Sequence, residues 1–137
     1  MRICGIEIDK NQAIIMSIEK YDDGMLEVTE DLKKIVLEND EESQSIWEFM
    51  ELVKSVLDTI CPNIIGVIKL NKKGRYPVSA VSSKVEALIQ TYNQEIVFVS
   101  PSTLKAYFSK NISPLNSKHK YQKPALELAY YLLQNIK

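Results

Sequence analysis

Two spacings of apolar residues divide the chain. Short runs rich in Ile and Val, typical of strands, occupy residues 2–9, 12–19, 25–36, 64–70 and 95–99. The run IIGVIKL (64–70) is almost continuously apolar, as expected of a strand buried on both faces. The third run is interrupted near Glu30-Asp31, so it is the least regular of the five predicted strands.

Other segments repeat their apolar residues every three or four positions, which predicts amphipathic helices. The clearest lies between Ser45 and Ile60, where Phe49, Val53 and Leu57 follow this spacing and Pro62 ends it. A proline is also favoured in the first turn of a helix, so Pro101 indicates a helix start. The expected helices are residues 45–60, 78–91, 100–108 and 121–136.

The element order is therefore β-β-β-α-β-α-β-α-α. Three successive strands followed by strands that alternate with helices predict an α/β fold, with a mixed five-stranded sheet flanked by helices. The length suits one domain over residues 1–137. The final helix is unusually apolar, which predicts either a well-covered core helix or a homodimer surface.

The composition is that of an ordinary globular protein, with 45% hydrophobic and 26% charged residues. No apolar run reaches the ~18 to 20 residues that a membrane span needs. The chain also begins without a signal-peptide pattern, so we expect a cytoplasmic protein that does not contact a membrane. Cys4 and Cys61 lie far apart in apolar patterns, which predicts reduced thiols in the core.

The charge is unevenly distributed along the chain. Residues 1–61 hold 6 Lys or Arg and 15 Asp or Glu, a net charge of -9, whereas residues 62–137 hold 11 and 3, a net charge of +8. This asymmetry fits a basic binding face, and it equally fits two halves that attract each other or a second copy.

Three stretches share a pattern with one superfamily: RICGIEI (2–8), IIGVIKLNKKGRYPVSAVSSKVEALI (64–89) and VFVSPSTLKAYF (97–108). Together with the element order they resemble the RuvC-like branch of the ribonuclease H-like superfamily. The stretches CGIEI, NKKGR, SSKVEALIQ and KYQKPALELAYYLL are similar to a family of short bacterial proteins of unknown function related to RuvC. The resemblance spans nearly the whole chain and implies a ribonuclease H-like fold.

The resemblance also implies where catalytic acids would stand. Nucleases of this superfamily hold two divalent cations with three or four carboxylates. Glu7 matches the first acid and shares a strand face with Asp9, but Lys69 stands where the second acid is expected. Glu127 is the only acid in the matching part of the last helix, and Glu86 lies outside the usual set. We therefore expect no bound cofactor, and a Glu7–Lys69 ion pair in place of a metal.

A basic segment is the alternative functional candidate. Between residues 66 and 84 the chain carries five basic residues, no acid, and an aromatic, Tyr76. Lys and Arg neutralise phosphates and an aromatic ring can stack on a base, so this composition suits nucleic acid. The candidate binding residues are Lys69, Lys72, Lys73, Arg75, Lys84 and Lys120. An ordinary solvated loop with surface lysines fits the same residues. His119, in a later loop, is either simply exposed or a residue that assists catalysis, as in some RuvC-like proteins.

Three functions stay open on this basis. The first is a non-catalytic domain that binds nucleic acid through residues 69–84. The second is a diverged nuclease that uses Mg²⁺ or Mn²⁺ with Glu7, Asp9, Glu127 and Glu86, in which Glu7 is the first metal ligand. The third is a homo-oligomeric interaction module, in which the acidic half of one copy meets the basic half of another.

Overall fold

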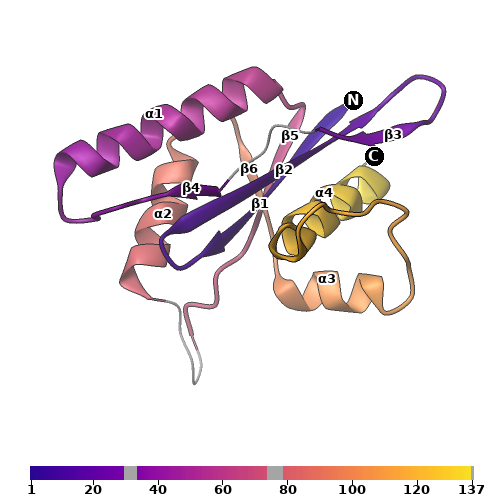
Figure 1. Cartoon of the computed structure of the whole chain (residues 1–137). Coiled ribbons are helices and arrows are strands. Elements are labelled where there is room, and N and C mark those ends of the chain that lie inside the picture. The colour runs from indigo at the N-terminus through magenta and orange to yellow at the C-terminus, as the bar shows by residue number, and fades with distance from the viewer. Residues whose placement is uncertain (30–33, 74–78, 137) are drawn as a thin grey trace.

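The computed structural model describes residues 1–29, 34–73 and 79–136 of the chain. A mixed sheet in the order β3-β2-β1-β5-β6 forms its centre, and a further strand, β4, pairs with β2 (Figure 1). β1 is antiparallel to β2 and parallel to β5, which is in turn parallel to β6. The strands are β1 Arg2–Asp9, β2 Gln12–Lys20, β3 Leu26–Val28, β4 Lys34–Val36, β5 Ile64–Ile68 and β6 Ile96–Val99. The predicted α/β fold with a mixed sheet is thus confirmed.

The prediction of five strands needs one correction, because the third predicted strand is two short ones. β3 pairs with the end of β2, opposite Ile18 to Lys20, and β4 pairs with its beginning, opposite Gln12 to Ile14. Residues 30–33 lie outside the described part of the chain.

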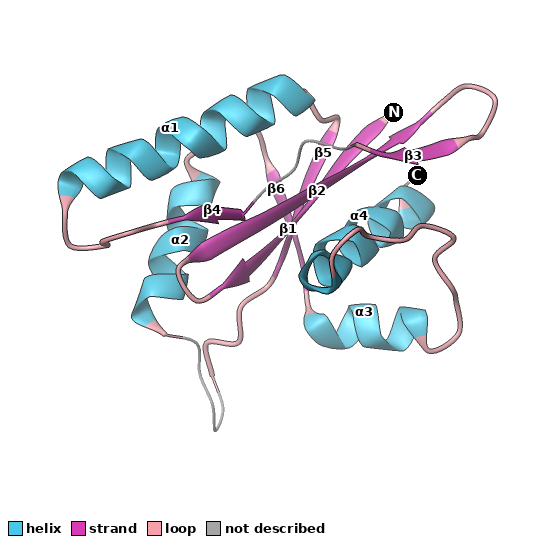
Figure 2. Ribbon diagram, in the orientation of Figure 1, coloured by secondary structure: helices cyan, strands magenta, loops and turns pink. Residues whose placement is uncertain are grey.

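In the described part of the chain, four α-helices and one short 3-10 helix cover the sheet. α1 and α2 lie on one face, and α3 and α4 lie on the other (Figure 2). Serine side chains cap two of them: Ser79 accepts from the Ser82 N–H at 3.3 Å, and Ser100 accepts from the Thr103 N–H at 3.2 Å. None of the described helices is long and apolar enough to cross a membrane. The helices are α1 Ser43–Ile60, α2 Ala80–Gln90, α3 Pro101–Phe108, η1 Lys120–Gln122 and α4 Lys123–Asn135.

The cysteines differ from the expectation that both lie in the core. Cys4 is buried on β1, and burial raises the pKa of its thiol. Cys61 is exposed, because it forms the end of α1 in the left-handed conformation, with φ at 51°, and its N–H donates to the Leu57 carbonyl at 2.8 Å. Pro62 follows and prevents the helix from continuing, so the helix end places Cys61 at the surface.

Close contact between β1 and α4 organises the core. Gly5 faces α4 so closely that a Cβ atom there would stand 2.2 Å from the Ala125 carbonyl oxygen. Its parallel partner Gly66 also faces α4, with a built Cβ 2.2 Å from Leu132 Cδ1. The apolar sequence of α4 is accounted for largely by core packing, since six of its residues are buried. They are Ala125, Leu126, Leu128, Ala129, Leu132 and Leu133.

Candidate functional site

The parallel strands β1, β5 and β6 all end at one edge of the sheet, called here the carboxyl edge. Asp9 ends β1, Lys69 follows β5, and the Lys69 N–H donates to the carbonyl of Val99, the last residue of β6, at 2.8 Å. The first turn of α2 also reaches this edge, where the Ser82 hydroxyl donates to the Lys10 carbonyl at 2.8 Å. Ligands of open α/β sheets bind outside the carboxyl ends of parallel strands, so this edge is the candidate site.

Glu7 lies on β1 two residues before Asp9, the residue that ends the strand at this edge. It lies two residues after Gly5 and therefore on the α4 face, and its side chain is partly buried. Burial, and secondly the negative charge of Asp9, raises the pKa of Glu7 from 4.5 to about 7. Asp9 is on the same face at the end of the strand and is exposed. The two predicted acids therefore share one face, as expected, and repel each other.

The expected ion pair between Glu7 and Lys69 does not form, because the two residues point to opposite faces of the sheet. Gly5 pairs with Gly66, and both face α4. Glu7 is two positions beyond Gly5 and keeps that face, whereas Lys69 is three positions beyond Gly66 and turns to the other. Lys69 is exposed and makes no ion pair with Glu7. The error lay in matching the motif without its strand register.

A different glutamate carries the ion pair near this edge. Glu86, on α2, is only 3% exposed, and its Oε1 lies 2.6 Å from Lys72 Nζ. Its Oε2 is buried and has no hydrogen-bond partner among the described residues. The pair ties the connection after β5 to α2. Lys72 is therefore partly neutralised from within the chain and is a weaker candidate for phosphate contact than an unpaired lysine.

Glu127 is not gathered with Glu7 and Asp9 into a metal centre. It lines a pocket of about 410 Å³ with Phe108, Asn111 and Lys123, between α4 and the segment that follows α3. Over residues 1–29, 34–73 and 79–136 there is no group of three His, Cys, Asp or Glu side chains placed to hold a metal ion.

The predicted basic residues are in different situations. Lys84 is turned away from the carboxyl edge, since its Nζ contacts the backbone carbonyl of Asp40 and lies 3.6 Å from Asp40 Oδ2. Lys69, Lys73 and Lys120 are exposed. Arg75, with Tyr76, lies outside the described residues. The edge also carries Lys10 in the turn after β1, an exposed lysine that we did not single out from the sequence.

Two aromatic residues and a lysine meet at the start of α4. The His119 and Tyr121 rings are stacked with centroids 5.5 Å apart and an angle of 7° between their planes. Lys34 Nζ, from β4, lies 4.1 Å from the centroid of the Tyr121 ring. The sequence signal for this group was only the alternation of Lys with His and Tyr in KHKY, because the contact with Lys34 joins distant parts of the chain.

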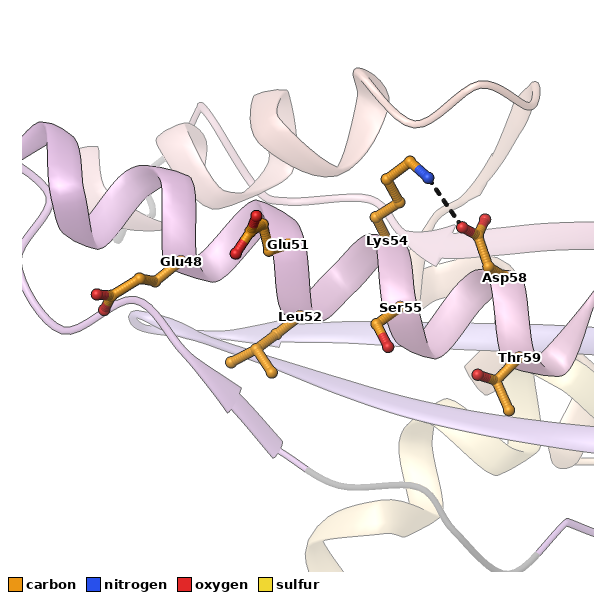
Figure 3. Close-up of a pocket in the computed structure, with 7 residues that line it drawn as sticks. All are labelled: Glu48, Glu51, Leu52, Lys54, Ser55, Asp58 and Thr59. Carbon is orange, nitrogen blue, oxygen red and sulfur yellow. Dashed lines mark hydrogen bonds and ion pairs between the residues drawn. The ribbon is translucent and has the colours of Figure 1, made fainter.

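A pocket on the surface of α1 lies away from this edge. It has a volume of about 910 Å³, and every described residue that lines it belongs to α1 (Figure 3). Its polar groups include Glu48, Glu51 and an ion pair of 3.0 Å between Lys54 and Asp58. Because one helix surface supplies these residues, the pocket offers little enclosure for a ligand. The carboxyl edge remains the stronger candidate.

Comparison with known proteins shows what the chain is similar to. The sequence model of one family, described as "Protein of unknown function (DUF3010)", matches residues 1–132. Among curated proteins no sequence match was found.

Several solved structures have a similar fold. RuvC of Thermus thermophilus has a TM-score of 0.73 at 10% identity, covering 98% of this chain and 96% of that chain. The same protein in complex with Holliday junction substrate has a TM-score of 0.70 at 11% identity, covering 98% of this chain and 95% of that chain. The yeast mitochondrial Holliday junction resolvase Ydc2 gives 0.55 at 15% identity, covering 97% and 70%. These likenesses confirm the RuvC-like, ribonuclease H-like fold.

Proposed function

Because this chain belongs to the DUF3010 family of proteins of unknown function and has the fold of RuvC, we propose that it binds nucleic acid without hydrolysing it. The observation that carries the proposal is the chemistry of the carboxyl edge. There Glu7 stands at the first acid of the RuvC-like pattern, the described residues bring no group of three potential metal ligands together, and the exposed lysines Lys69 and Lys73 follow β5. The positive charge of these lysines favours a phosphate at this edge.

The exposed lysines around the carboxyl edge supply the binding groups. Lys69 and Lys73 lie after β5, Lys10 lies after β1, and Lys120 lies in η1, just before α4. Because α4 ends near the amino end of β1, its beginning is directed toward the carboxyl edge (Figure 1). These lysines therefore come from three segments that lie toward the carboxyl edge. Their ammonium groups can neutralise phosphates along a nucleic-acid backbone, which makes the affinity dependent on salt.

A charge-reversal experiment tests this proposal. We would measure the fluorescence anisotropy of a labelled four-way DNA junction and of RNA and DNA duplexes, titrated with protein between 50 and 200 mM salt. The triple variant Lys69→Glu, Lys73→Glu, Lys120→Glu is expected to bind on the order of 100-fold more weakly than the wild type, with a smaller salt slope. An equal loss of affinity in a control variant with the same net charge would show that binding depends on net charge alone and not on the carboxyl edge.

The control variant is Lys20→Glu, Lys105→Glu, Lys110→Glu. It changes the net charge by the same amount, at exposed lysines on the opposite end of β2 and toward the end of α3. We expect it to bind at most a few-fold more weakly. Salt-sensitive self-association without nucleic-acid binding would contradict the proposal and favour the homo-oligomeric interaction module instead.

A further inference from the structure

The group formed by Lys34, His119 and Tyr121 has a geometry that the proposed function does not explain. The stack is exposed: Tyr121 keeps 37% of its surface accessible, and His119 is exposed as well. Side chains at the surface are not held in such an arrangement by burial. Rings stacked at 7° partly cover each other, and the Lys34 ammonium lies on the Tyr121 ring, so the ring faces that stay open are the flat surfaces on which a nucleobase can stack.

The turn that carries the two rings is fixed by Gln122 beneath it. Gln122 is 7% exposed, and its Oε1 accepts a hydrogen bond from the His119 N–H at 3.0 Å. The Gln122 N–H donates to the His119 carbonyl at 3.1 Å, and the Ser117 hydroxyl donates to the same carbonyl at 2.8 Å. The backbone of this turn is therefore ordered before any ligand arrives, which lowers the entropic cost of binding.

The position of Lys34 relates the stack to Glu7. Glu7 pairs with Ile14 across β1 and β2, and Ile14 pairs with Lys34 across β2 and β4. Directly paired residues share a face, so Glu7 and Lys34 both point to the α4 side, with their Cα atoms roughly 10 Å apart at ~4.8 Å between strands. The aromatic surface over Lys34 is thus one side of the same site.

Lysines alternate with the rings in sequence. Lys118 and Lys120 flank His119, and Lys123 follows one turn later, and all three are exposed. We infer that Lys34, His119 and Tyr121 form a stacking platform for an unpaired nucleobase, with these lysines beside it for the neighbouring phosphates. This inference rests on the proposed function. It narrows the ligand to single-stranded or branched nucleic acid, because bases inside a duplex already stack on one another.

The test uses a short single-stranded DNA that contains 2-aminopurine, whose fluorescence is quenched when it stacks, and a blunt duplex of the same length. The wild type is expected to quench the probe and to prefer the single strand. The variant His119→Ala, Tyr121→Ala should lose the quenching and bind the single strand about tenfold more weakly, with its duplex affinity unchanged. His119→Phe, Tyr121→Phe keeps two rings and should retain both properties.

Two controls separate the possible failures. Tyr21→Ala removes another exposed tyrosine, 47% accessible, at the far end of β2 and should behave as the wild type. His119→Ser alone changes one exposed side chain and covers the case in which the double variant fails to fold. Equal losses on single strand and duplex, or no loss at all, would overturn the platform while leaving the proposed function intact. A wild type that binds neither probe would overturn both.

Discussion

Two glutamates near the carboxyl edge are withdrawn from water, and their surroundings differ. Glu86, on α2, is almost fully buried and has a lysine 2.6 Å away. Glu7, on β1, makes no ion pair among the described residues, and its closest charged influence is the like charge of Asp9, which helps to raise its pKa to about 7.

This difference in surroundings gives the two glutamates different roles: the charge of Glu86 is structural, whereas the charge of Glu7 is unpaired among the described residues. Lys72 neutralises Glu86 from within the chain, so this pair holds α2 to the connection after β5 whatever the protein binds. The charge of Glu7 instead depends on pH and on what approaches the carboxyl edge. Under the proposed function, this partly buried acid lies at an edge whose exposed lysines bind phosphate.

The largest expected effect concerns the close contact between β1 and α4 at Gly5. In Gly5→Ala the new methyl group would meet the backbone oxygen of Ala125 at 2.2 Å, so α4 has to move away from β1. We expect a loss of about 3 kcal/mol or more in the free energy of unfolding, and a fall in Tm on the order of 10 °C. Gly66→Ala is the matched change, because its methyl group meets the end of the flexible Leu132 side chain, and it should cost less. Thermal unfolding followed by circular dichroism would rank the two, and the reverse order would contradict this account of the core.

The next effect tests the role of the Glu86 pair. Lys72→Met leaves the buried Glu86 carboxylate without its cation, which should cost about 2 kcal/mol, a value reduced from that of a fully buried pair because Lys72 is itself half exposed. Lys73→Met removes a neighbouring exposed lysine and should change stability by less than about 0.5 kcal/mol. Urea unfolding measures both. Adding Glu86→Gln to Lys72→Met should recover part of the loss, and an additive loss would show that the two side chains do not interact.

Glu7 should make stability depend on pH. Its pKa in the folded state, about 7, is above its ordinary value of 4.5, so stability is highest below pH 4.5 and is lost as pH rises toward 7. Glu7→Gln removes this loss and should stabilise the protein by about 1 to 2 kcal/mol at pH 8, after allowance for partial exposure, with little effect at pH 4.5. Urea unfolding at both values measures it, with Asp22→Asn, an exposed acid in the turn after β2, as a control. If Glu7→Gln changed the free energy of unfolding by the same amount at pH 8 and at pH 4.5, the elevated pKa of Glu7 would be contradicted.

The smallest effect tests the strand register. Because Lys69 faces away from Glu7, Lys69→Met should change the free energy of unfolding by less than about 0.5 kcal/mol and leave its pH dependence as in the wild type. A marked shift in that pH dependence would mean that the two side chains interact after all.

Local patterns predicted most of the fold, and long-range register accounts for what they missed. Apolar spacing was enough for β1, β2, β5 and the helices, because each element buries one regular face or stripe. The broken third strand and the exposed Cys61 depend on how short segments meet their neighbours. The site shows the same division. Glu7 could be found from its motif. The sheet face on which Lys69 lies, in contrast, follows from the pairing of Gly5 with Gly66. The contact of Lys34 with Tyr121 follows from the register of three strands and from the path of the chain into α4.

The central claim is that the carboxyl edge binds nucleic acid and does not cut it. The most direct measurement is a single experiment on a labelled four-way junction, with binding followed by anisotropy and strand integrity by denaturing gel, in EDTA, Mg²⁺ and Mn²⁺. We predict salt-sensitive binding in all three conditions, intact strands, and the same behaviour in Glu7→Gln. Cleavage that requires Mg²⁺ or Mn²⁺ and disappears in Glu7→Gln would contradict the claim and identify a working nuclease.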